Sequence, residues 1–151
     1  MENKIKNIEL LTNIFEKFPS FHDAEVLQIT LKRKEDGKFC PILETLIDIK
    51  HYGLDNSFLV NLKFKGIFGL KLENFNHQNV LGNLSIQNFS EEYWESIKRD
   101  SRLLGVVSQK EIDRLNFYVK FHYCFGMEAE FLCNEVIVDS VKLLTEGEND
   151  L

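Results

Sequence analysis

Apolar residues recur every three or four positions near the start of the chain. The positions on this face are Ile5, Ile8, Leu11, Phe15 and Phe18, with Leu10 and Ile14 beside them. This spacing is typical of one face of an α-helix. Pro19 is expected to end the helix, because the residue before a proline is pushed out of the helical region. The apolar face then has to be buried, most simply against a sheet.

Alternating apolar and polar residues predict β-strands over most of the remaining chain. The runs span residues 25–31, 42–50, 58–64, 67–73, 84–89, 115–123 and 128–144. Asp36 and Gly37 indicate a turn, and we expect a hairpin with a loose loop there. Gly69 indicates a bulge. The last run is predicted to be one long strand with a kink near Asn134.

Two segments interrupt the strand pattern. Residues 74–82 are rich in amides, which favour turns, so we expect a loop or one helical turn held to the core by Phe75, Val80 and Leu81. Ser90 and the acidic residues after it predict the start of a helix, with Gly105 at its far end. The residues expected on its apolar stripe are Tyr93, Trp94, Ile97, Leu103 and Leu104, and residues 108–111 have the spacing of a capping box for a second short helix.

These elements predict a single α+β domain over residues 1–151. An N-terminal helix packs on a mainly antiparallel, curved sheet of about six or seven strands, with a helical insertion before the last two strands. Residues 1–4 and 146–151 are expected to be frayed. A chain of this length buries enough surface to fold without a metal or a disulfide.

Charge and cysteine content disfavour several classes of function, among them nucleic-acid binding and zinc binding. The net charge is −6 and no basic block stands apart from acidic neighbours, which disfavours nucleic-acid binding. An acidic surface attracts a basic protein partner, although the same charge also serves solubility alone. No membrane span and no signal peptide are recognisable, and three cysteines without Cys-x-x-Cys spacing argue against a zinc site. We therefore expect a cytoplasmic protein without a cofactor.

Residues 18–26 gather His22, Asp23 and Glu25 within four positions. If Asp23 and Glu25 share one face of a strand, their Cβ atoms lie about 6–7 Å apart, a spacing that suits acid–base chemistry. Adding His77 gives a candidate metal site. The favoured alternative is structural: Asp23 satisfies loop backbone groups, and Glu25 faces water or a lysine.

Motifs of catalysis are absent elsewhere, since the sequence holds no phosphate loop, nucleophile elbow or helical zinc motif. We predict no catalytic, metal-binding or cofactor-binding residue. Aromatic residues remain as candidate interface anchors or as caps of the core. These are Tyr52, Tyr93, Trp94, Tyr118 and Tyr123.

The stretch 18–26 resembles a Trp-Pro-x-Phe-His-Asp-x-Glu-Val motif, with Phe18 replacing the tryptophan. Residues 73–81 are similar to a second pattern, Glu-x-Phe-Asn-His-Gln-Asn-Val-Leu. A weaker third match covers residues 123–126 and 131–133. All three are features of a family of bacterial immunity proteins from polymorphic toxin systems. The resemblance spans most of the chain, although the insertion up to Gln109 is longer than in that family.

The resemblance implies a cytosolic protein that neutralises a cognate toxin by stoichiometric binding, without catalysis. It makes the matched residues candidates for functional or scaffold roles: His22, Asp23, Glu25, Asn76, His77, Gln78 and Asn79. We expect 76–79 to lie against 18–26 and help dock the first helix. Two alternatives stay open: a metal-dependent or acid–base enzyme using His22, Asp23, Glu25 and His77, and a structural homo-oligomeric binding module. Both a monomer and a homodimer are compatible with the sequence.

Overall fold

The computed structural model describes residues 4–100 and 109–144. Its helices are α1 (Glu9–Phe15), α2 (Glu91–Arg99) and α3 (Gln109–Ile112). Its strands are β1 (Glu25–Glu35), β2 (Lys38–His51), β3 (Asn56–Lys65), β4 (Phe68–Glu73), β5 (Val80–Asn88), β6 (Phe117–Phe125), β7 (Glu128–Cys133) and β8 (Glu135–Leu143). None of the described helices is both long and apolar enough to cross a membrane.

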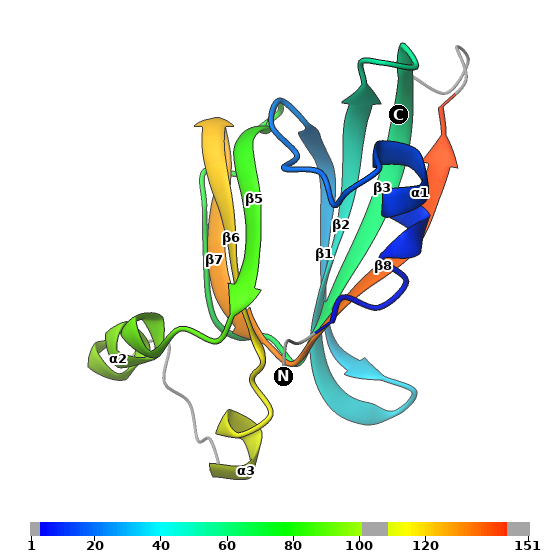
Figure 1. The fold of residues 1–151 in the computed structure, drawn as a ribbon. Helices are drawn as coiled ribbons and strands as arrows, with labels where there is room; N and C mark the ends of the chain where they lie inside the picture. The colour runs from blue at the N-terminus through cyan, green and yellow to red at the C-terminus, as the bar shows by residue number, and fades with distance from the viewer. Residues whose placement is uncertain (1–3, 101–108, 145–151) are drawn as a thin grey trace.

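All eight described strands belong to one sheet with the order β4-β7-β6-β5-β1-β2-β3-β8. Every strand pairing is antiparallel, which confirms the predicted sheet type, although the number of strands is larger than expected. β1 meets β5 only through the pair Glu25 and Val80. The sheet is therefore split into two half-sheets, β4-β7-β6-β5 and β1-β2-β3-β8, which stand apart as two walls (Figure 1).

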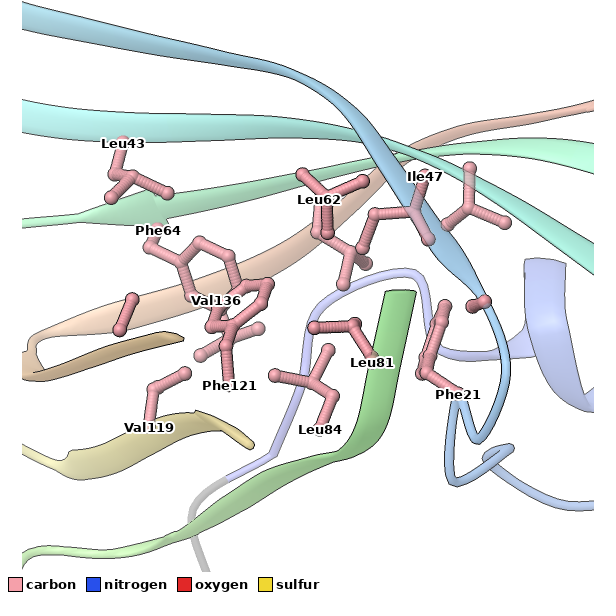
Figure 2. Close-up of a cluster of buried hydrophobic side chains, with 14 of the residues drawn as sticks. Phe21, Leu43, Ile47, Leu62, Phe64, Leu81, Leu84, Val119, Phe121 and Val136 are labelled. Atoms are coloured by element: carbon pink, nitrogen blue, oxygen red, sulfur yellow. The ribbon is translucent and has the colours of Figure 1, made fainter. Parts of the chain in front are cut away.

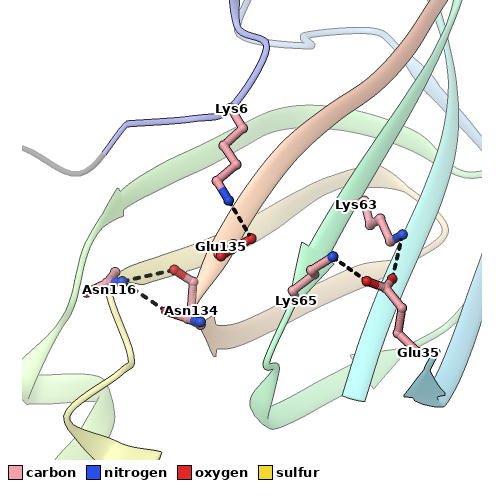
Figure 3. Close-up of polar contacts among 7 residues, drawn as sticks. All are labelled: Lys6, Glu35, Lys63, Lys65, Asn116, Asn134 and Glu135. Atoms are coloured by element: carbon pink, nitrogen blue, oxygen red, sulfur yellow. Dashed lines mark hydrogen bonds and ion pairs between the residues drawn. The ribbon is translucent and has the colours of Figure 1, made fainter. Parts of the chain in front are cut away.

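The prediction of one long final strand was wrong. β7 pairs with β4 and β6, whereas β8 pairs with β3 in the other half-sheet. Asn134 is the point where the chain crosses, and its backbone N–H donates to the carbonyl oxygen of Lys65 at 2.9 Å. Asn116 holds the crossing in place, because its Nδ2 lies 3.1 Å from the Asn134 carbonyl oxygen (Figure 3). The helical insertion consequently precedes the last three strands, not the last two.

The core fills the space between the half-sheets (Figure 2). Phe64 from one wall meets Phe131 from the other, with ring centroids 5.1 Å apart, and Phe121 packs against both rings. The alternation predicted for β3 and β6 is confirmed by their burial. The inward residues are Phe58, Val60, Leu62 and Phe64 on β3, and Phe117, Val119 and Phe121 on β6.

Several local expectations change. α1 ends at Phe15, before Pro19, because Glu16 has a φ of 68° that no helix accommodates. The β1–β2 loop is tight: Asp36 and Gly37 have φ values of 52° and 77°, as a two-residue hairpin turn requires. The bulge at Gly69 is confirmed by a register shift.

Burial also departs from the expected pattern at Leu31 and Phe75. Leu31 is 55% exposed and Phe75 is 48% exposed, so neither side chain joins the core. Leu81 is fully buried, as expected. Phe75 therefore does not hold its loop to the core.

α2 begins as predicted, since Ser90 Oγ accepts the backbone N–H of Tyr93 at 3.1 Å. Its buried residues Tyr93 and Ile97 pack on the outer side of the first half-sheet, where the Ile97 side chain lies over Gly69. The expectations for 103–105 and Ser108 lie outside the described residues.

Candidate functional site

The two motif-bearing stretches lie side by side where the half-sheets meet. The backbone N–H of Asp23 donates to the Leu81 carbonyl oxygen at 2.8 Å, and that of Leu81 donates to Ala24 at 2.8 Å. The backbone N–H of Val26 donates to Asn79 at 2.9 Å. We call residues 20–26, 74–82 and 123–127 together the corner. The expectation that 76–79 lies against 18–26 agrees with this geometry.

Asn79 lies at the centre of the corner and is only 2% exposed. Its Oδ1 accepts two backbone N–H groups, from Asn76 at 2.9 Å and from Met127 at 3.1 Å. Its Nδ2 donates to the carbonyl oxygens of Asn76 at 2.8 Å and Val26 at 3.5 Å. One amide side chain therefore connects its own loop to β1 and to the β6–β7 turn.

Gly126 makes that contact sterically feasible. Its φ of 89° lies in the left-handed region, which favours glycine. A Cβ added there would sit 2.3 Å from the carbonyl oxygen of Gln78 and 2.7 Å from Asn79 Oδ1. Residues 18–26, residues 73–81 and the 123–126 part of the third match thus meet around Asn79.

His22 and Asp23 join the loops mainly through the backbone. His22 Nδ1 lies 2.8 Å from the Gly82 carbonyl oxygen, so the ring N–H at this position donates a hydrogen bond to that oxygen. Asp23 has a φ of 65° and precedes β1, so it does not share a strand face with Glu25. The Asp23 carboxylate lies 3.6 Å from His22 Nε2, with more than half of each side chain exposed. The condition for a carboxylate pair on one strand face is therefore not met.

The remaining candidates have different surroundings. Glu25 pairs across the sheet with Asp48, the pKa of which is raised by burial. Asn76 Oδ1 accepts the backbone N–H of His77 at 2.8 Å. His77 and Gln78 have exposed side chains at the outer surface of the corner.

The geometry offers little for catalysis. Within residues 4–100 and 109–144, no three His, Cys, Asp or Glu side chains are grouped closely enough to hold a metal ion. A cleft of about 500 Å³ opens beside the corner, between residues 17–20 and β5. Lys17 is the titratable side chain that lines it. The hydrogen bonds around Asn79 and His22 instead fix the positions of loops.

The aromatic candidates divide into two groups. Tyr93 donates to the Gly69 carbonyl oxygen at 2.5 Å, its ring stacks on Tyr118, and Trp94 packs on Phe68. Burial raises the pKa of both tyrosines. Tyr93, Trp94 and Tyr118 therefore hold α2 on the sheet. Tyr52 and Tyr123 are 71% and 60% exposed, and they remain available to a partner.

The sequence did not identify Gly82 and Met127 as members of the site. The Gly82 carbonyl oxygen accepts a hydrogen bond from His22, and the Met127 backbone N–H donates one to Asn79. Both act through backbone atoms, so their residue types carry no signal for these bonds. Gly126 did carry a signal, because a glycine at the end of an apolar strand indicates a turn. Its contact with Asn79 depends on the tertiary fold.

Comparison with known proteins places the chain in a family. No curated protein and no solved structure matches it. The sequence does match the family described as Immunity protein 50 over residues 7–144, a range that covers the corner and every described strand. The chain therefore belongs to the Immunity protein 50 family.

Proposed function

We propose that this protein neutralises a cognate bacterial toxin by binding it stoichiometrically, without catalysis. The observation that carries the proposal is the family match over residues 7–144. The corner geometry supports it, because Asn79 and His22 are engaged with backbone groups of the fold. The polar motifs then serve the scaffold, and the surface is left to recognise the toxin.

The protein is further proposed to act in the cytoplasm, on a toxin that reaches or is made in that compartment. The net charge of −6 favours fast encounter with a toxin that has a basic surface. Binding at a basic active site would block the toxin's substrate directly.

Co-expression tests this proposal. The toxin domain encoded next to this gene is expressed in a sensitive bacterium with or without this protein. We expect growth to be restored by the wild type and by a His22→Ala, His77→Ala double variant, since no catalytic role is assigned to either histidine. Unchanged toxicity beside well-expressed wild-type protein would refute the proposal. Loss of protection in a stably folded double variant that still binds the toxin would favour the enzyme alternative, whereas loss of binding would make the histidines contact residues.

A further inference from the structure

Three aromatic side chains of the corner are exposed to solvent. Phe75 is 48%, Tyr123 60% and Phe125 52% exposed. Phe125 pairs with Val80 and Tyr123 with Leu81, so both lie at the end of β6 beside the start of β5. Phe75 belongs to the loop that leads into β5. The three residues therefore belong to one end of this half-sheet, where β6 ends and β5 begins. That end lies at the upper left in Figure 1.

Three carboxylates, those of Glu73, Glu128 and Asp23, belong to segments that meet at the same end of the half-sheet. Glu73 pairs with Glu128 in the β4–β7 ladder, next to the loop that carries Phe75. Asp23 lies across the corner, hydrogen-bonded through its backbone to Leu81. Like charges directly opposite each other destabilise a sheet, so the Glu73–Glu128 pair does not serve the stability of the fold.

These carboxylates differ from those elsewhere in the sheet. Glu35, Glu44 and Glu135 each form an ion pair with a lysine, at Lys63, Lys32 and Lys6 respectively. In the described parts of the chain, no lysine or arginine forms an ion pair with Asp23, Glu73 or Glu128. Within residues 4–100 and 109–144, Glu73 and Glu128 therefore have no ion-pair partner, and Asp23 has only the His22 ring at 3.6 Å.

A second exposed apolar patch lacks this feature. Tyr52 and Leu54 are 71% and 54% exposed in the β2–β3 turn, with Leu143 nearby on β8. Lys50 lies over the Tyr52 ring at 5.6 Å and pairs with Asp55 at 3.2 Å. The Lys50 and Asp55 charges neutralise each other there, so this patch offers no unpaired charge to a charged partner. It therefore provides a matched control.

We propose that Phe75, Tyr123 and Phe125, together with Asp23, Glu73 and Glu128, form the surface that binds the toxin. We call it the aromatic–acidic face. The inference rests on the proposed function and names the kind of partner surface that fits: lysine and arginine side chains around an apolar centre. Such cations pair with the carboxylates and stack on the rings, and aromatic anchors of this kind dominate binding energy.

Binding of the purified toxin domain encoded next to this gene tests the inference. We expect Phe75→Ala and Tyr123→Ala each to raise Kd by roughly 30-fold or more, as hot-spot residues do. The isosteric variant Glu73→Gln, Glu128→Gln should slow association and weaken its dependence on salt. The control Tyr52→Ala, Leu54→Ala should bind like the wild type. Melting temperatures of the alanine variants should stay near that of the wild type, because the replaced side chains are exposed. The glutamine variant should be at least as stable as the wild type, because it removes a pair of like charges.

The outcomes separate this inference from the proposed function. Failure of the wild type to bind or neutralise the toxin would refute both. If the wild type neutralises and the face variants bind with unchanged Kd, only the aromatic–acidic face is refuted. A wild-type homodimer that Phe125→Ala converts to monomers would also refute it, because the rings would then serve self-association.

Discussion

Asn79 Oδ1 accepts the backbone N–H of Met127 at 3.1 Å, and this bond joins two parts of the chain 48 residues apart. Both partners are buried, with Asn79 only 2% and Met127 only 1% exposed. Loss of the side chain would leave a buried N–H without an acceptor, which costs more than an ordinary hydrogen bond contributes. The bond therefore ties the half-sheet of β5 and β6 to the loop that meets β1.

Replacing Asn79 tests this role. We expect Asn79→Ala to lower the free energy of unfolding by about 2–4 kcal/mol, because it removes the acceptor for Asn76 and Met127 and the donor to Val26. Urea denaturation followed by circular dichroism measures the change. His77→Ala, in the same loop but exposed, should stay within about 0.5 kcal/mol of the wild type. Equal effects of the two variants would show that Asn79 has no special role.

Gly126 should be equally sensitive, for a steric reason. Gly126→Ala places a Cβ 2.3 Å from the Gln78 carbonyl oxygen and forces a left-handed conformation on alanine. We expect a loss of about 2–5 kcal/mol in the free energy of unfolding. Gly37→Ala is the matched control, since its φ is also positive, at 77°, but nothing lies within 4 Å of the added Cβ. Gly37→Ala should cost only about 1–2 kcal/mol, and an equal loss in both variants would rule out the contact with Gln78.

Asp23 makes its structural contribution through backbone conformation. With a φ of 65°, glycine suits this position and alanine does not. We expect Asp23→Ala to be less stable than Asp23→Gly by about 1 kcal/mol. Thermal unfolding of the two variants measures the difference. Equal stability would mean that the left-handed conformation of residue 23 is not needed.

Glu35 gives the protein a pH-dependent contribution to stability. Hydrogen bonds from Lys63 and Lys65 (Figure 3) lower the pKa of its carboxyl from 4.5 to about 2. Because the folded pKa lies below the unfolded one, this contribution is present above pH 4.5 and is lost as the pH falls toward about 2. Glu35→Gln should therefore melt below the wild type at pH 7, with the gap closing at low pH.

Carbon NMR of the Glu35 carboxyl measures this pKa directly. Lys63→Met should raise it toward the ordinary value. A carboxyl that already titrates near its ordinary value in the wild-type protein would contradict the ion-pair account.

The sequence predicted the elements that have a local cause. Asp36 and Gly37 produce a turn wherever they occur between strands, and Ser90 caps a helix through its own hydroxyl. Asn134 was predicted to be a kink within one strand, because the run 128–144 contains no glycine or proline that would indicate a break. The crossing between half-sheets depends on its bonds to Lys65 and Asn116, residues that are distant in the sequence.

The candidate site was predicted in part for the same reason. The resemblance selected Asn79 and His22, but their residue types do not reveal that they bond to Met127 and Gly82 through backbone atoms. Phe75 was predicted to be buried because its side chain is apolar, but the structure leaves it exposed. The rings of the aromatic–acidic face become visible as a group only after the strands are paired.

The most direct test of stoichiometric neutralisation is a titration of toxin activity. The toxin domain encoded next to this gene is held at a concentration far above Kd, and its residual activity is measured as this protein is added. We predict a linear fall to zero at a molar ratio of one to one, unchanged by longer incubation. Complete and time-dependent inactivation by much less than one equivalent would contradict the account, because it would mean that the protein turns over.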